Sequence, residues 1–248
     1  VVASHVEGIA VGERLYGFFP MASHVLMKPG EPSERGFTDA MPHRSELPGL
    51  YNYYARTQSE PAQLQALEDQ RCIFFPLFMT GYVIADLLLD NDWFGVQQVV
   101  IGSASSKTGF STAAFIRAAG FEGDIIGLTS DQNVGFSEAL GCYDRVVPYR
   151  EVEGVANESS AYIDIAGDVA VRSRLHHSLK DNAAQTLLVG ATHWDQFGQS
   201  VGGGPLPPVG WRGAARAWCA RGARVGCARR ATASSRKTGS GARVLCAR

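Results

Sequence analysis

From Val96 onward the sequence alternates short apolar runs with helix-like segments, and this alternation restricts the fold more than any other feature. The runs predict strands at Val96–Ile101, Asp124–Leu128, Arg145–Val147, Ala161–Ile165 and Thr186–Val189. Strands that alternate with helices at this spacing form βαβ units. Because the runs are almost wholly apolar, we expect helices to cover both faces of the sheet, as in parallel sheets. The predicted fold class is therefore α/β, with a Rossmann-like doubly wound parallel sheet.

The residues before this region predict a different kind of structure. Residues 1–28 predict short strands, and residues 29–60 are rich in proline, glycine, serine and charge, as in a long surface connection. Residues 61–92 predict mostly helix. The apolar run Cys72–Leu89 approaches the length of a membrane span, but it contains proline, glycine and aspartate. We therefore expect a buried helix entered through Pro76, and no membrane association.

The C-terminal stretch has a composition of its own. Residues 1–201 carry a net charge of −11 from 13 basic and 24 acidic residues, whereas residues 202–248 hold 10 basic residues and no acid. Glycine, alanine and arginine, which have GC-rich codons, fill 28 of these 47 positions. We expect a disordered tail and interpret it as the out-of-frame translation of a GC-rich gene. The alternative is an arginine-rich nucleic-acid-binding segment, which we disfavour because it has no RGG repeat and only two aromatic residues, Trp211 and Trp218.

Cysteine usage indicates the redox compartment. Before the tail only Cys72 and Cys142 occur, with no CxxC motif and no Cys/His cluster at zinc spacing. Two distant cysteines favour a reduced, cytoplasmic protein over a secreted one, and no metal site is expected.

The predicted sheet brings three loops to one place. In doubly wound sheets, ligands bind at the carboxyl ends of the strands. The segments that follow three of the predicted strands there are Gly102–Thr108, Thr129–Asn133 and Gly190–Trp194. We therefore expect the binding site to be formed by these loops.

The first loop, GSASSKTG, lies where a dinucleotide-binding fold has its glycine-rich turn. Small residues there let backbone N–H groups approach a pyrophosphate at the start of the next helix. Ser103, Ser105 and Ser106 add hydroxyl donors, and Thr108 is the predicted N-cap. Lys107 would lie at the positive end of the helix dipole, which favours a bound anion. Two other interpretations remain open at this point: a shortened phosphate-binding loop for a nucleoside triphosphate, and a serine-rich turn that only caps the helix.

The end of the second strand indicates which dinucleotide is bound. NAD sites usually have an acid here that bonds the ribose hydroxyls. This chain has Thr129 and Ser130, which accommodate a 2′-phosphate without charge repulsion, and Asp131 follows later. Together with Lys107, these residues favour NADP(H) over NAD(H).

Other polar residues carry weaker signals. We expect His193 to bond local backbone groups rather than act as an acid, and Asp164 to bond amides of a neighbouring helix. His176 and His177 are adjacent on a helix and so point to different faces, which excludes a metal pair. No serine or cysteine nucleophile constellation occurs, and we assign no catalytic residue.

Seven blocks of the sequence, read in order, resemble one known family. They are VGERLYGFFP, PLFMTGYVIADLLLDNDWFG, VVIGSASSKTG, IIGLTSDQN, LGCYDRVVPY, YIDIAGD and VGATHWD. They look like the domain of unknown function 2855 family, which is similar to the zinc-free, quinone-reductase-like branch of the medium-chain dehydrogenase/reductase superfamily. The resemblance covers about residues 6–200.

This resemblance implies a GroES-like β-barrel followed by a Rossmann domain, with NADP(H) bound between them. Residues 1–60 would be the remnant of an N-terminally truncated barrel and its connecting loop, residues 61–201 the Rossmann-like domain, and residues 202–248 the tail. The cofactor-binding residues it implies are Ser103, Ala104, Ser105, Ser106, Lys107, Thr108, Thr129, Ser130, Asn133, Gly190, Ala191 and Thr192.

The implied activity is hydride transfer to a small carbonyl, enone or quinone-like substrate. Zinc-free members of the superfamily act mostly by positioning donor and acceptor. A chain that lacks half of the cleft wall can be inactive even when the whole protein is an enzyme. The alternative function is a non-catalytic nucleotide-binding or interaction protein on the same fold.

Overall fold

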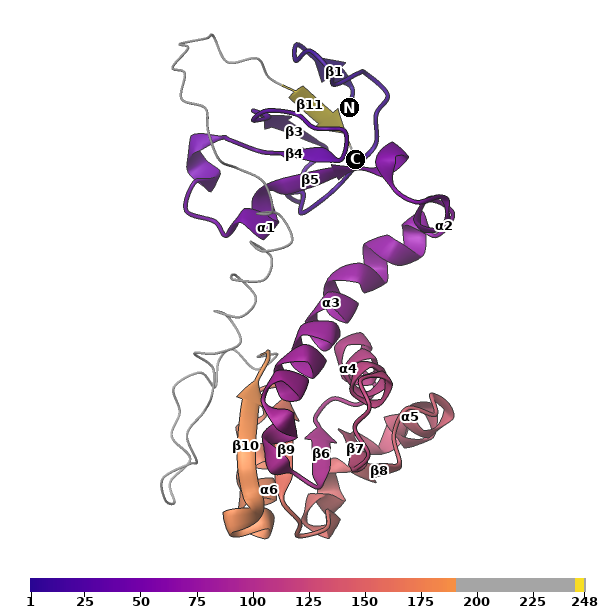
Figure 1. Cartoon of the computed structure of the whole chain (residues 1–248), viewed down its shortest axis with the longest axis vertical. Helices are drawn as coiled ribbons and strands as arrows, with labels where there is room; N and C mark the ends of the chain where they lie inside the picture. Colours follow the sequence, from indigo (N-terminus) through magenta and orange to yellow (C-terminus); the bar gives the residue numbers. More distant parts are fainter. Residues whose placement is uncertain (191–243, 248) are drawn as a thin grey trace. The chain divides into compact units, whose positions relative to one another are not determined.

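The structure, a computed structural model, describes residues 1–190 and 244–247 of the 248-residue chain. These residues form two compact units, and each is described by itself (Figure 1). The smaller unit consists of Val1–Ile73 and the strand Val244–Ala247, and the larger unit begins at Phe74.

The larger unit is built on a five-stranded parallel sheet in the order β10-β9-β6-β7-β8 (Figure 1). Its strands are β6 (Gln98–Ile101), β7 (Asp124–Thr129), β8 (Arg145–Pro148), β9 (Ser160–Asp164) and β10 (Ala183–Leu188). The chain starts in the central strand β6, extends to β7 and β8 on one side, and then returns to β9 and β10 on the other. This order confirms the predicted doubly wound Rossmann-like sheet.

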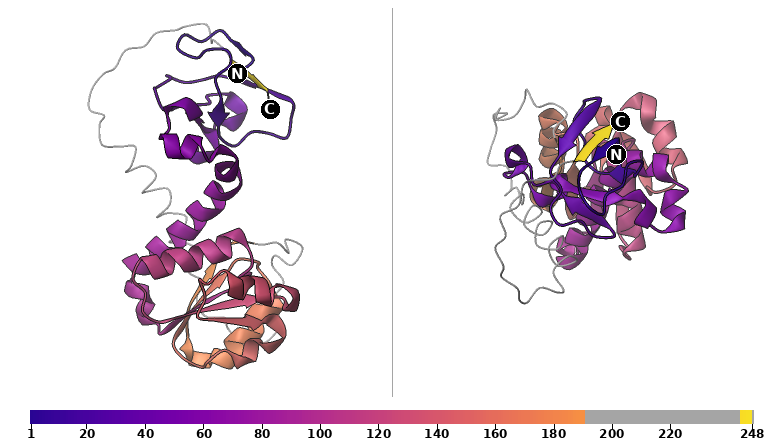
Figure 2. Two further views of the ribbon diagram at one scale, coloured as in Figure 1. Left: turned by 90° about the vertical axis from the view of Figure 1, so that its right-hand side faces the viewer. Right: turned by 90° about the horizontal axis from the view of Figure 1, so that it is seen from above.

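Helices cover both faces of this sheet, as the apolar strands predict (Figure 2). The helices of the chain are α1 (Gly49–Asn52), α2 (Ala62–Gln65), α3 (Glu68–Asp90), α4 (Lys107–Ala118), α5 (Val134–Ala139) and α6 (Val169–Leu179), and a 3-10 segment, η5, spans Tyr149–Gly154. Val99 and Ile101 of β6 pack with α3 and α4, whereas Val100 packs with η5 and α6. Successive strand residues point to opposite faces, so a fully apolar strand requires cover on both sides.

Helix α3 corrects one prediction. It begins at Glu68 and contains Pro76 in its interior, whereas the sequence predicts a helix entered through Pro76. The acids Glu68 and Asp69 in the first turn favour this earlier start because they face the positive end of the helix dipole. A proline removes one N–H donor from a helix, but α3 continues past Pro76 to Asp90.

The same helix is less buried than predicted. Its buried residues are Gly81, Ile84, Ala85 and Leu88, while Ile73 and Tyr82 are 54% and 52% exposed. Gly81 lies against α4, because a Cβ there would come within 2.4 Å of the Ser111 hydroxyl. By length and hydropathy alone, α3 is the one helix of the described residues that could cross a membrane, a property that core helices share.

The smaller unit contains two antiparallel three-stranded sheets, in the orders β1-β11-β3 and β2-β5-β4. Its strands are β1 (Ala3–Ser4), β2 (Leu15–Tyr16), β3 (His24–Met27), β4 (Gly36–Thr38), β5 (Tyr53–Arg56) and β11 (Val244–Ala247). Ile9, Met27, Phe37 and Tyr54 form its buried core, and the Tyr54 hydroxyl donates to the Phe18 carbonyl at 2.8 Å. Antiparallel strands of this kind are consistent with the remnant of a β-barrel.

Strand β11 belongs to the stretch for which a disordered tail is predicted. Its backbone pairs with β3 from Val244 to Ala247 and also with β1, and this pairing orders these four residues. The tail residues 202–243 lie outside the described residues.

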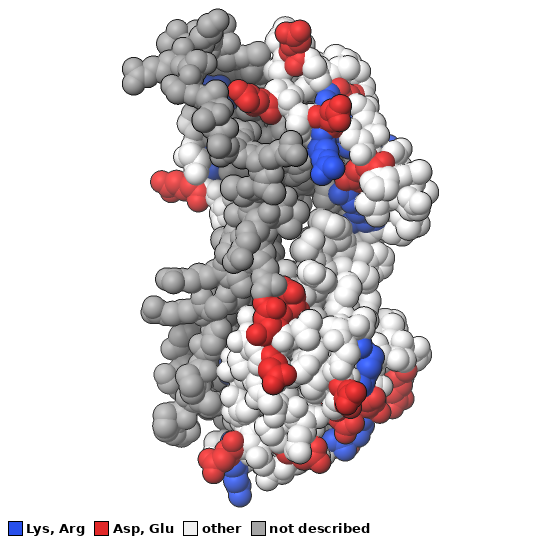
Figure 3. All heavy atoms as spheres, in the orientation of Figure 1, with Lys and Arg blue, Asp and Glu red and all other residues white. Residues whose placement is uncertain are grey.

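Basic and acidic side chains form ion pairs on the surface of the described residues. On the face drawn in Figure 3, Lys and Arg of the described residues lie among Asp and Glu. The ion pairs of the larger unit include Arg117 with Asp144, and Arg150 with both Asp131 and Glu151.

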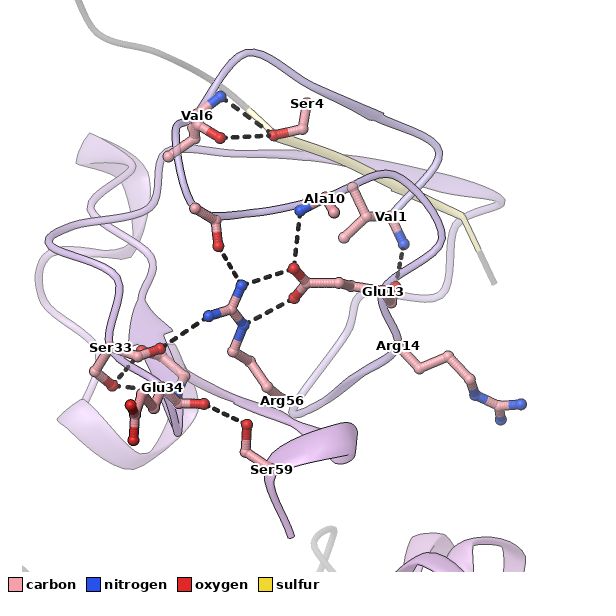
Figure 4. A network of polar contacts seen from close by, with 12 residues as sticks. Val1, Ser4, Val6, Ala10, Glu13, Arg14, Ser33, Glu34, Arg56 and Ser59 are labelled. Atoms are coloured by element: carbon pink, nitrogen blue, oxygen red, sulfur yellow. Dashed lines mark hydrogen bonds and ion pairs between the residues drawn. The ribbon is translucent and has the colours of Figure 1, made fainter.

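A buried ion pair connects distant segments of the smaller unit (Figure 4). The Arg56 side chain donates from Nη2 and Nε to the two carboxylate oxygens of Glu13, at 2.6 and 2.8 Å. The Ala10 N–H donates to the same carboxylate at 2.8 Å, and Arg56 also donates to the Ser33 carbonyl at 3.2 Å. The two side chains are only 7% and 13% exposed. Hydrogen bonding from Arg56, opposed by burial, lowers the pKa of Glu13 below its usual value of 4.5.

We predict that Glu13→Gln lowers the free energy of unfolding of this unit by about 3 kcal/mol, because it leaves the Arg56 charge buried without its partner. The wild-type pair contributes fully above pH 4.5, and its contribution is lost as the pH falls through the lowered pKa of Glu13. The difference between wild type and variant should therefore shrink in acid. Hydrogen exchange of the β5 amides measures the opening of this unit separately from the larger one.

The matched control is Glu68→Gln, which removes an ion pair whose Arg14 side chain is 71% exposed. Its expected effect is below about 0.5 kcal/mol. Equal effects of the two substitutions would contradict the assignment of Glu13 as a buried structural acid.

Candidate functional site

The strand order locates the site. The chain reverses direction across the sheet between β6 and β9, and ligands of doubly wound sheets bind at the carboxyl ends of the strands beside such a reversal. Three segments lie there in the described residues: the loop Gly102–Ser106 after β6, the segment Ser130–Asn133 after β7, and the turn Ile165–Asp168 after β9.

The loop after β6 is a tight, internally bonded turn. Ser103 has a positive φ of 54°, a backbone conformation that favours glycine. The Ser106 N–H donates to the Ser103 carbonyl at 2.8 Å, and the Ala104 N–H donates to the Leu128 carbonyl at 2.9 Å. These bonds hold the loop against the end of β7 and start α4 directly after it.

Ser106, rather than the predicted Thr108, caps helix α4. Its hydroxyl accepts the N–H of Gly109 at 3.0 Å, and the helix begins at Lys107. Thr108 lies in the first turn, where its carbonyl accepts from the hydroxyls of Ser111 and Thr112. The serine preceding the helix has the extended backbone of an N-cap, so it satisfies the orphan N–H that Thr108 cannot reach.

Three backbone N–H groups in the loop and at the start of α4 have no backbone acceptor among the described residues. The N–H groups of Lys107 and Thr108 belong to the first turn of α4, which has no intrahelical acceptors for them. The Ser105 N–H finds no acceptor among the described residues. Grouped donors at the positive end of a helix form an anion-binding arrangement.

Two glycines permit the close packing around this loop. A Cβ at Gly102 would lie 2.9 Å from the Tyr162 hydroxyl, and a Cβ at Gly109 would lie 2.5 Å from the Ser103 carbonyl oxygen. Gly109 thus allows α4 to pack on the loop, the role of the third glycine in a dinucleotide-binding fingerprint. That glycine is displaced along the chain here, and the sequence pattern alone did not reveal it.

Ala104 packs away from the loop opening. It is fully buried, its carbonyl accepts from the Tyr143 hydroxyl at 2.8 Å, and its Cβ would meet one on Gly127 at 2.8 Å. Burial raises the pKa of Tyr143, so this hydroxyl stays a donor. The alanine side chain therefore fills the space above the sheet and leaves the loop backbone accessible.

The predicted residues of the second segment do lie beside the loop. The buried Thr129 hydroxyl donates to the Ser105 hydroxyl at 3.3 Å, which joins the ends of β6 and β7. Asn133 donates from its side chain to the Ser130 hydroxyl at 3.0 Å. Lys107 has no ion-pair partner among the described residues, and its ammonium lies 5.9 Å from the centroid of the Phe74 ring.

Sequence reasoning missed two residues that follow β8. The Tyr149 hydroxyl accepts the Ser103 N–H at 3.0 Å, and Arg150 forms an ion pair with Asp131. The available signal was their place: directly after the third strand, at the same edge of the sheet as the phosphate-loop candidate.

Two acidic side chains fix the turn between β9 and α6. Asp164 is fully buried, and it accepts from the Gly167 N–H of the turn at 2.7 Å and from the Arg172 side chain of α6 at 2.8 Å, rather than from the helix amides that the sequence predicted. Burial raises the pKa of Asp164, and these donors oppose that change. Asp168 caps α6 by accepting the N–H groups of Ala170 and Val171.

The last predicted segment is described at one residue only. A Cβ at Gly190 would lie 2.5 Å from the Ile165 carbonyl oxygen, so only glycine fits there. Ala191, Thr192 and His193 lie outside the described residues. His176 and His177 diverge as predicted, with hydrogen bonds to Thr186 and to the Ser173 carbonyl.

We predict that Gly109→Ala destabilises the larger unit by about 1–3 kcal/mol, because the added methyl group meets backbone at the loop and forces α4 away from it. Urea unfolding followed by circular dichroism measures the loss. Gly135→Ala is the matched control: nothing lies within 4 Å of its Cβ position in α5, and the substitution should be neutral or stabilise by about 0.5–1 kcal/mol. A neutral Gly109→Ala would overturn the close loop–helix packing.

Comparison with known proteins gives one family and a set of solved structures. A family model described as "Protein of unknown function (DUF2855)" matches residues 1–206. No curated protein matches the sequence.

Among solved structures, Escherichia coli K-12 YhdH with bound NADPH matches at 17% identity and TM-score 0.35, over 52% of this chain and 39% of YhdH. The quinone oxidoreductase from Coxiella burnetii matches at 21% identity and TM-score 0.34, over 44% and 33%. Mycobacterial Rv1454c complexed with NADPH matches at 16% identity and TM-score 0.38, over 65% and 45%. The match thus spans less than half of each of these proteins, and the fold assignment rests on the strand order of this chain.

Proposed function

This chain belongs to the DUF2855 family, and from that premise we propose that it binds NADP(H) and transfers hydride to a small carbonyl, enone or quinone-like molecule. It would then be an oxidoreductase of the zinc-free medium-chain type. The proposal concerns the activity of a whole protein. The matched part of each of the three solved structures is less than half of that structure's length.

The observation that carries the proposal is the loop Gly102–Ser106 at the reversal of the sheet. The N–H groups of Ser105, Lys107 and Thr108 lie at or just before the positive end of α4 without a backbone acceptor in the described part of the chain, and the Lys107 side chain adds a cation without a carboxylate partner there. This arrangement suits the pyrophosphate of a dinucleotide. The predicted residues Ser103, Ala104 and Ser106 would shape the loop rather than contact phosphate through their side chains, and Gly190 would permit close packing on the Ile165 carbonyl.

The end of β7 supports a preference for the phosphorylated dinucleotide. Thr129 and Ser130 end the strand with hydroxyl groups, and Asn133 orients Ser130. The charge of Asp131, which would repel a 2′-phosphate, is paired with Arg150. On binding, the Arg150 guanidinium can exchange this carboxylate for the phosphate, because both accept bidentate hydrogen bonds.

The chemistry would come from the cofactor, which supplies or accepts a hydride at its nicotinamide ring. The residues of this chain would bind the pyrophosphate, fix the ribose and exclude water at the sheet edge. Metal is not required for this positioning, and the described residues contain no group of three or more His, Cys, Asp or Glu side chains that could hold a metal ion.

One observation favours a second candidate, a non-catalytic nucleotide-binding protein. The Ser103 N–H is bonded to Tyr149 and is not free for a phosphate. Such a site would bind the dinucleotide more weakly than an all-glycine turn.

The deciding experiment titrates the protein with NADPH and monitors binding by cofactor fluorescence. Enones and quinones from a panel are then added, and oxidation of the cofactor is monitored by the absorbance of the reduced nicotinamide. Binding with substrate-dependent oxidation supports the oxidoreductase. Binding without turnover supports the second candidate, and no binding of NADPH, or of NADH titrated in the same way, rejects both.

We predict that Arg150→Ala weakens NADPH binding by about 10-fold and leaves NADH binding nearly unchanged, because only the 2′-phosphate needs the guanidinium. Isothermal titration with each dinucleotide gives the two affinities. Arg145→Ala is the control: this residue begins β8, at the opposite end of the strand, and bonds the Gly154 carbonyl. An equal loss for both dinucleotides would place Arg150 elsewhere than at the 2′-phosphate.

A further inference from the structure

Arg174 of α6 forms hydrogen bonds with η5, the segment that begins with Tyr149 and Arg150. Its Nε and Nη2 donate to the two carboxylate oxygens of Glu153, each at 2.6 Å. The same guanidinium donates to the Arg150 carbonyl at 2.9 Å and to the Tyr149 carbonyl at 3.2 Å. One side chain thus satisfies a carboxylate and two backbone carbonyls of η5.

The rest of η5 has few other attachments to α6. Val152 is fully buried against Leu175 and Leu179, and the Ser178 hydroxyl donates to the Glu153 carbonyl at 3.2 Å. These contacts hold the middle of η5. At the end that begins at Tyr149, the hydrogen bonds to the helix come from Arg174, and the Tyr149 side chain also packs against the cluster that contains Leu175 and Leu179.

That end carries both contacts with the candidate cofactor site. The Tyr149 hydroxyl accepts the Ser103 N–H of the loop after β6, where the backbone has its positive φ. Arg150 pairs with Asp131 after β7. Arg174 therefore holds the backbone of the two residues whose side chains contact the ends of β6 and β7.

We infer that Arg174 is a positioning residue that fixes Tyr149 and Arg150 and thereby sets the preference of this site for NADP(H) over NAD(H). The inference rests on the proposed function, which supplies the dinucleotide. Among the described residues, the hydrogen bonds of Arg174 all go to η5 and none goes to the loop or to the start of α4. Its effect on the site therefore passes through η5.

The ion pair between Arg174 and Glu153 is fully charged near neutral pH. The hydrogen bonds from Arg174 lower the pKa of Glu153, which therefore remains a carboxylate, and the same bonds raise the pKa of Arg174. Glutamine at position 174 keeps some of the side-chain length and removes the charge and the planar fork of donors.

The test compares Arg174→Gln with the wild type in two measurements. The first is hydrogen exchange of the Tyr149–Val155 amides without ligand, which we expect to become at least about 10-fold faster because η5 loses its bonds to the helix. The second is isothermal titration with NADPH and with NADH. We expect NADPH to bind about 10-fold more weakly and NADH to change less than about twofold. Arg174→Lys should restore part of the NADPH affinity.

The matched control is Arg117→Gln. Arg117 is 42% exposed against 41% for Arg174, pairs with Asp144, and also donates to the carbonyls of Phe121 and Gly123. It lies at the amino ends of β7 and β8, opposite the site, so it should change neither measurement.

The outcomes separate the inference from the proposed function. Unchanged exchange in Arg174→Gln overturns the inference whether or not a dinucleotide binds. An unchanged ratio of NADPH to NADH affinity, in a variant that binds both, overturns it as well. If the wild type binds neither dinucleotide, the proposed function fails, and the role of Arg174 in cofactor specificity fails with it. Faster exchange in Arg174→Gln would still show that Arg174 holds η5 in place.

Discussion

The hydrogen bond from the Ala104 N–H to the Leu128 carbonyl joins the loop after β6 to the end of β7, and the rest of the site is arranged around it. It holds the chain in a turn sharp enough to begin α4 within six residues of Ile101. With the loop held there, the first turn of α4 begins beside the end of β7, and the Thr129 hydroxyl reaches Ser105. An anion bound at that point would meet donors that are already in place and need no reorganisation.

The same turn is built without most of the glycines of a dinucleotide-binding fingerprint. A glycine-rich turn has to approach a ligand, a strand and a helix at once. In this chain Gly102 provides the approach to Tyr162 and Gly109 the approach of α4, so the positions between them can carry side chains. Ser103 accepts the cost of a left-handed backbone, about 1 kcal/mol, and its N–H bond to Tyr149 offsets part of that cost.

Support for the loop comes from a part of the chain far from it in sequence. Tyr149 and Arg150 follow β8, and α6 holds them through Arg174. Parallel sheets with helices on both faces make such coupling natural, because each βα loop rests on the elements that follow other strands. The smaller unit has an analogous fixed point in the Glu13–Arg56 pair, which is separated by 43 positions in sequence.

The amino-acid sequence by itself determined the doubly wound sheet, because each strand is apolar on both faces and only a covered parallel sheet satisfies that pattern. It also predicted the candidate site, since ligands of doubly wound sheets bind at the carboxyl ends of the strands and the loops after β6 and β7 carry Ser105, Thr129 and Ser130. Tertiary structure alone decided that Ser106 caps α4 in place of Thr108, that Gly109 acts as the packing glycine, and that α3 runs through Pro76 with an exposed apolar surface. It alone also brought Tyr149, Arg150 and Arg174 to the site. Periodicity reports which side of an element is buried, whereas these features depend on backbone geometry and on contacts between segments distant in the chain, which no local pattern encodes.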